Sequence, residues 1–128
     1  MYFLDTTFLV GLFVSNDQWH PQAIEIYGKI RNEKLVISRM VIAETITVLK
    51  NKIRTKDIRE IYNNLPRLFE IIEDAQLFDG AMTEFVKYDA HISFFDSMYV
   101  FIMYEKNISK IVSFDSDFDR VDGIIRLH

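Results

Sequence analysis

The chain of 128 residues contains no cysteine. This absence excludes disulfide bonds, thiolate zinc sites and cysteine nucleophiles, and it fits an intracellular protein. The sequence also lacks any apolar run close to the roughly 18 residues that a membrane-spanning helix needs. Its first ten residues have no basic leader and carry Asp5 within an apolar stretch, which makes a poor secretion signal. We therefore expect a cytoplasmic protein that does not enter a membrane.

An excess of positive charge is missing as well. The net charge of −4 argues against nucleic-acid binding through overall charge, but it leaves room for a local basic patch. The densest basic group lies within ten residues and comprises Lys50, Lys52, Arg54, Lys56 and Arg59. We expect this group to contact RNA if the protein binds any, although a solvated helix end is the plainer explanation of such a run.

Apolar residues, by contrast, are plentiful. They make up 49% of the chain, which is enough to build the packed core of one domain over residues 1–128. Short apolar runs predict strands at 2–4, 35–37, 75–78, 110–113 and 124–127. Helical spacing predicts helices at 8–14, 21–32, 39–53, 79–89 and 93–106, and one more within 56–73. This alternation predicts an α/β fold with a mostly parallel sheet between two layers of helices.

Three acidic residues stand where the surrounding pattern is apolar. Asp5 ends a predicted strand, Glu44 shares a helical face with Val41 and Val48, and Asp96 is the only acidic residue in 90–104, which has no Lys or Arg. A buried carboxylate needs a cation or hydrogen bonds to remain ionised. Simpler explanations exist for each: a helix cap for Asp5, an exposed helix face for Glu44, and a helix first turn for Asp96.

A fourth acidic group, Asp115, Asp117 and Asp119, alternates along a short turn. These three side chains cannot all face one way, so we expect one or two to be ligands and Asp119 to remain outside the site. Clustered carboxylates, without cysteine and with only three scattered histidines, suit Mg²⁺ or Mn²⁺ better than zinc. Phosphoryl chemistry is the usual use of such a site.

The order and spacing of these signals resemble the PIN-domain ribonucleases, and among them the VapC-like toxins of toxin–antitoxin pairs. Four segments carry the resemblance: residues 3–7 (FLDTT), 41–44 (VIAE), 93–96 (SFFD) and 111–118 (IVSFDSDF). It implies a PIN-like three-layer fold with catalytic acids Asp5, Glu44, Asp96 and Asp115, an accessory metal ligand in Asp117, and supporting hydroxyls from Thr6, Thr7 and Ser113. Ser113 stands where threonine is common in the family, and Thr7 where serine or asparagine is.

The resemblance further implies a Mg²⁺-dependent endoribonuclease in which Mn²⁺ could replace Mg²⁺. Its partners would be an RNA substrate, a cognate antitoxin and a second copy of the chain. Within the same fold, an RNA-processing enzyme without an antitoxin stays open as an alternative. A Mg²⁺-dependent phosphatase or receiver-like domain is a more distant one, because such a phosphatase needs an aspartate where Thr7 stands. A non-catalytic interaction module is the remaining alternative.

Overall fold

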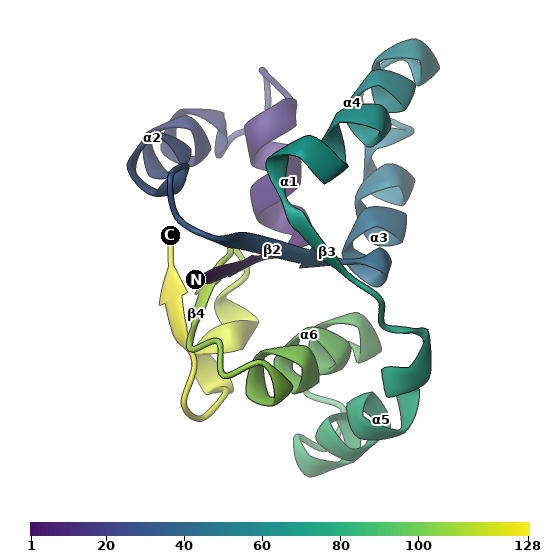
Figure 1. Cartoon of the computed structure of the whole chain (residues 1–128), viewed down its shortest axis with the longest axis vertical. Helices are drawn as coiled ribbons and strands as arrows, with labels where there is room; N and C mark the ends of the chain where they lie inside the picture. The colour runs from purple at the N-terminus through teal and green to yellow at the C-terminus, as the bar shows by residue number, and fades with distance from the viewer.

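A five-stranded parallel sheet forms the middle of the molecule (Figure 1). The structure, a computed structural model, describes all residues from 1 to 128. The strands lie in the order β3-β2-β1-β4-β5, and each neighbouring pair is parallel. Their bounds are β1 Tyr2–Leu4, β2 Leu35–Ser38, β3 Glu70–Ile72, β4 Lys110–Val112 and β5 Ile125–Leu127. The first strand is therefore central, with later strands added on both sides of it.

Six helices cover the two faces of this sheet. The helices α1 to α4 lie on one face, and α5 and α6 lie on the other (Figure 1). Their bounds are α1 Thr6–Phe13, α2 His20–Ile30, α3 Arg39–Leu49, α4 Thr55–Leu68, α5 Phe78–Lys87 and α6 Phe94–Glu105. Since crossovers between parallel strands are right-handed, the path outward from β1 to β3 and the return to β4 place their helices on opposite faces. The predicted three-layer α/β fold is confirmed.

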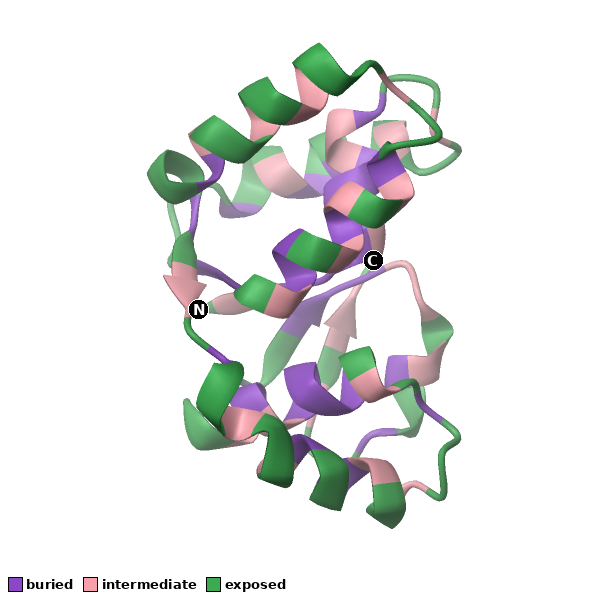
Figure 2. Cartoon of the chain, turned by 90° about the vertical axis from the view of Figure 1, so that its right-hand side faces the viewer, coloured by how far each residue is buried: buried purple, intermediate pink, exposed green.

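The core lies where the inner strands meet both helical layers. Phe3, Leu4, Ile37, Ile111 and Val112 are completely buried, as the continuous apolar runs of parallel strands require. Buried residues occupy the inner strands and the inward faces of the helices, while the outward faces are exposed (Figure 2). None of the helices is both long and apolar enough to cross a bilayer.

The structure corrects two predictions. The strand expected at 75–78 is wrong, because Ala75–Leu77 forms a short 3₁₀ helix, η1, and the edge strand is β3 at Glu70–Ile72. Only one residue separates this strand from α4, so in the sequence its apolar residues look like a continuation of the helix. Only pairing with β2, through Ile71 and Ile72, makes this segment a strand.

The second correction concerns α3, which ends at Leu49 rather than near residue 53. Leu49 is completely buried against Val10 and Val14 in a small cluster apart from the main core. Ile53 packs against the same cluster, and its amide donates a hydrogen bond to the Leu49 carbonyl at 3.1 Å. This turn lets the chain reverse into α4 while Ile53 stays partly buried.

Gly80 permits the close packing of α5 against α6. A Cβ atom at this position would occupy the space of the Phe101 ring. We expect Gly80→Ala to lower the free energy of unfolding by about 1–3 kcal/mol, because the ring or the helix must move. Denaturant titration measures this change.

Gly28→Ala is the matched control, since an added Cβ on α2 meets no atom within 4 Å. It should raise the free energy of unfolding by about 0.4–1 kcal/mol through lower entropy of the unfolded chain. Equal stability of the two variants would contradict the close approach of α5 and α6.

Candidate functional site

Asp5 occupies the single residue between β1 and α1. It is the N-cap of α1, and its Oδ1 accepts hydrogen bonds from the Phe8 amide at 3.0 Å and the Thr7 hydroxyl at 2.8 Å. Its Oδ2 accepts from the Ser113 hydroxyl at 2.6 Å. Burial nevertheless raises the pKa of Asp5 to about 6; these hydrogen bonds oppose the shift, and the nearby charge of Asp115 adds to it. Asp5 is therefore both a helix cap and a carboxylate short of positive charge.

Ser113 joins the ends of two neighbouring strands. Because β1 and β4 are paired, the residues that follow them meet at the carboxyl edge of the sheet. The Ser113 hydroxyl donates to Asp5 and accepts from the Asp115 amide at 2.9 Å, while the Phe114 amide donates to the Thr7 hydroxyl at 2.9 Å. These bonds fix the start of the acidic turn relative to Asp5.

Glu44 reaches the same region from α3 and is half-buried. Its Oε1 accepts hydrogen bonds from the Thr6 hydroxyl at 2.6 Å and from the Tyr99 hydroxyl at 2.9 Å. Burial is the main cause of a raised pKa for Tyr99, which therefore stays protonated and donates. Glu44 therefore does not lie on an exposed helix face, which was the simpler explanation, because its carboxylate bonds to Thr6 and Tyr99 at the sheet edge.

Asp96 lies in the first turn of α6, on the opposite face of the sheet from α3 (Figure 1). Ser93 caps this helix, because its hydroxyl accepts a hydrogen bond from the Asp96 amide at 3.0 Å. The pKa of the Asp96 carboxyl is raised to about 8, mainly by burial and then by the charges of Asp115, Asp5 and Glu44. Asp96 therefore lies in a helix first turn, and its carboxylate faces other carboxylates.

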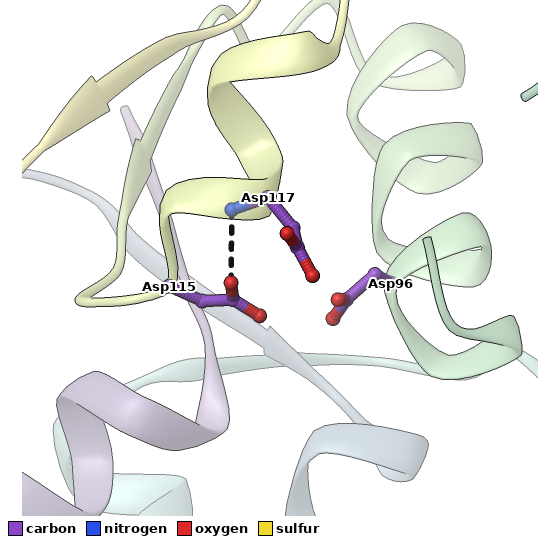
Figure 3. Close-up of side chains that lie close together, drawn as sticks. All are labelled: Asp96, Asp115 and Asp117. Carbon is purple, nitrogen blue, oxygen red and sulfur yellow. Dashed lines mark hydrogen bonds between the residues drawn. The ribbon is translucent and has the colours of Figure 1, made fainter. Parts of the chain in front are cut away.

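The acidic turn supplies the last two members of the cluster. It forms a short 3₁₀ helix, η2, at Ser116–Arg120. Asp115 caps this helix, because its Oδ1 accepts a hydrogen bond from the Asp117 amide at 2.9 Å. Asp115 and Asp117 point toward Asp96 (Figure 3), and one carboxylate oxygen of each lies within 4.8 Å of the others. Asp119 instead forms a two-bond pair with Arg126, at 2.8 and 2.9 Å, and lies outside this group.

The structure thus gathers the sequence-predicted acids, and it distributes the predicted hydroxyls among them. Thr7 and Ser113 hold Asp5, and Thr6 holds Glu44. Tyr99, which donates to Glu44, is a member of the site that the sequence-based prediction did not include. The available signal was its spacing, since a residue three positions after Asp96 shares its helix face.

The five residues of the predicted basic group differ in how close they lie to the acidic site. All five side chains are exposed, and they extend from the end of α3 into α4. Lys52 lines a hollow together with Thr6 and Thr7, which places it beside the hydroxyls of the acidic site. Arg54 is engaged with Asp57 at 3.2 Å. Lys52 is therefore the member of this group that the fold brings next to the acids.

The donor set fits a hard divalent cation. Asp96, Asp115 and Asp117 offer oxygen atoms alone, and burial together with neighbouring carboxylates raises the pKa values of Asp5 and Asp96. No histidine belongs to the cluster, and His20 and His91 each lie against a backbone carbonyl elsewhere. Mg²⁺ and Mn²⁺ are the ions that such a carboxylate set suits.

Comparison with solved structures supports this fold. VapC20 from Mycobacterium tuberculosis, described as a Sarcin-Ricin loop cleaving toxin, superposes with a TM-score of 0.85 at 23% identity, covering 93% of each chain. A toxin–antitoxin complex from Klebsiella pneumoniae gives 0.72 at 18% identity, covering 98% of this chain and 96% of that one. VapBC2 from Rickettsia felis, bound to a promoter DNA fragment, gives 0.70 at 18% identity with the same coverage.

Family membership follows from the sequence itself. None of the curated proteins matches the chain closely enough to count as a relative. The sequence model of the PIN domain, however, matches residues 2–124, which include every acid of the cluster. The chain therefore belongs to the PIN-domain family.

Proposed function

We propose that this PIN-domain protein is a Mg²⁺-dependent endoribonuclease. The observation that carries the proposal is the convergence of five carboxylates, from the ends of two strands and from two helices, without enough positive charge to neutralise them. Membership of a nuclease family supports hydrolysis of nucleic acid, and similarity to VapC structures supports a toxin-type nuclease. RNA as the substrate is our inference from that similarity.

Asp5 and Asp96 would be the main ligands of the ion, with Asp115, Asp117 and Glu44 completing the set directly or through water. When bound, the ion supplies Lewis-acid chemistry that offsets phosphate charge and makes a water molecule a better nucleophile. The protein contributes the positioning. Thr7 and Ser113 fix Asp5, and Thr6 and Tyr99 fix Glu44, so little rearrangement is needed when substrate binds.

Removing either main ligand tests this assignment. We expect Asp5→Asn and Asp96→Asn each to lower metal-dependent cleavage of structured RNA about 100-fold or more. Loss of a group that only supports a metal ligand lowers activity about 10–100-fold, and loss of a ligand itself should lower it at least as much. Gel assays with Mg²⁺ or Mn²⁺, and with EDTA as the metal-free reference, measure this loss.

Asp79→Asn is the matched control, because Asp79 also lies in the first turn of a helix, α5, but is exposed and outside the cluster. It should cleave at the wild-type rate. Wild-type activity in either ligand variant would refute the site.

The raised pKa values also predict how metal and pH affect stability. The Asp96 carboxyl has a pKa of about 8 in the folded protein and 3.8 as its reference value, so the folded state holds its proton more tightly. Stability of the metal-free protein should therefore fall as pH rises toward about 8, where this carboxyl ionises. A divalent ion competes with that proton, so Mg²⁺ should raise Tm more at about pH 8.5 than at about pH 6.

Thermal melts at the two pH values, with Mg²⁺ or EDTA, measure this difference. Asp96→Asn should lose most of the pH dependence of the Mg²⁺ effect. Because this variant keeps every histidine, the loss would not come from histidine titration. An equal Tm rise at both pH values in the wild type would show that the acids do not bind the ion.

We also propose an antitoxin partner and a homodimer. The similar VapBC and toxin–antitoxin complexes support the antitoxin.

The homodimer is supported by three exposed apolar side chains that lie one turn apart on α5. They are Phe78, Met82 and Val86, which are 48%, 48% and 68% exposed, and a second copy of the chain would cover them. Light scattering should give the mass of a dimer, and Met82→Glu should give that of a monomer, while the exposed Thr83→Glu on the same helix should stay dimeric. A monomeric wild type would rule out the homodimer.

A further inference from the structure

The single tryptophan of the chain, Trp19, lies beside the acidic site rather than in the core. Its ring stacks on Phe114 with centroids 5.0 Å apart and planes within 8° of parallel. More than a third of Trp19 is exposed, at 38%. Phe114 directly follows Ser113, the residue that holds Asp5, and packs against Phe8 behind it. An exposed aromatic platform is thus attached to the residues that position the acids.

Hydrogen bonds fix this platform relative to Asp5. The Phe114 amide donates to the Thr7 hydroxyl, and that hydroxyl donates to Asp5. The Trp19 amide donates to the Asp17 carboxylate at 2.9 Å, which occupies one oxygen of that acid. Gly11 lets the stack approach α1, since a Cβ there would lie 3.3 Å from the Phe114 ring and 3.4 Å from the Trp19 Cβ.

A hollow of about 220 Å³ lies against the stack. Its apolar lining comes from Trp19, Phe114, Val10 and Val48; Thr6 and Thr7 join it to the acidic site, and Lys52 and Asp17 supply its charges. This volume is below the roughly 300–1,000 Å³ of sites for drug-sized ligands, so it suits one planar ring system. Lys52 is the one positively charged residue of this lining, so it is the group available to a phosphate.

We propose that this hollow is a nucleobase subsite, which takes one unpaired base of the RNA against Trp19 while the adjoining phosphate lies at the acids. The inference rests on the proposed ribonuclease function. Stacking needs no net positive charge, which matters for a protein of charge −4. Because a base must leave its helix to enter, the subsite selects loops or single strands. Lys52 would contact a phosphate flanking the inserted base.

Fluorescence tests the proposal directly, since Trp19 is the only tryptophan. A single-stranded oligonucleotide whose backbone resists hydrolysis, titrated with Mg²⁺ present, should quench Trp19 emission in a saturable manner. An abasic nucleotide at the inserted position should abolish the quench, and a scan along the oligonucleotide finds that position. Binding is followed separately by the anisotropy of a labelled oligonucleotide.

Kinetics give a second readout. Trp19→Ala should raise KM for a cleaved RNA about fivefold or more, the effect of losing one base–aromatic stack, with little change in kcat. Trp19→Phe should recover most of that loss. Tyr62→Ala, which removes an exposed aromatic from α4, should match the wild type. Circular dichroism establishes that the variants fold, and the wild-type titration decides the question if Trp19→Ala does not.

Oligonucleotide binding without any change in Trp19 emission would overturn the subsite, as would an unchanged KM in folded Trp19→Ala. Quenching by a peptide partner but not by RNA would also overturn it and assign the hollow to protein recognition. These outcomes differ from failure of the proposed function, in which the wild type cleaves no RNA under any metal condition.

Discussion

Asp5, Asp96 and Asp115 repel one another at the carboxyl edge of the sheet, and burial removes much of the water that would screen them. The same repulsion that disfavours the metal-free fold favours any cation that enters, because each carboxylate gains a partner at once. In the proposed metal site, affinity for a divalent ion and lower stability of the metal-free protein would be two consequences of one arrangement. The apolar core, which joins both helical layers to the sheet, must offset this cost.

The chain holds its acids with hydroxyl groups rather than with cations. Thr7 and Ser113 donate to Asp5, and Thr6 and Tyr99 donate to Glu44, so each carboxylate is oriented without losing its charge. Two arginines lie near the acids: Arg120 approaches Asp117 at 4.0 Å, and Arg126 forms its ion pair with Asp119 and donates to the Ser113 carbonyl. Arg126 steadies the acidic turn, while Asp5, Glu44, Asp96 and Asp115 form no ion pair. Orientation and charge are thus supplied by separate residues.

The sequence predicts those parts of the molecule that depend on local pattern. The buried inner strands, the amphipathic helices and the acids in apolar surroundings are all visible in it. What depends on pairing between distant segments is not. The β3 strand is a strand only because β2 lies beside it, and Tyr99 becomes part of the site only when α6 meets α3 across the sheet edge. Trp19 and Phe114 are 95 positions apart, so their stack has no local signature.

The central claim is that these acids form one cation site at the carboxyl edge of the sheet. Crystals soaked in Mn²⁺ and measured for anomalous scattering would test it most directly. We predict a strong Mn²⁺ peak bounded by the carboxylates of Asp96, Asp115 and Asp117 and facing Asp5, and its loss in Asp96→Asn. The account would be contradicted by saturating Mn²⁺ that leaves these carboxylates without a peak, or by a peak bound only at another part of the surface.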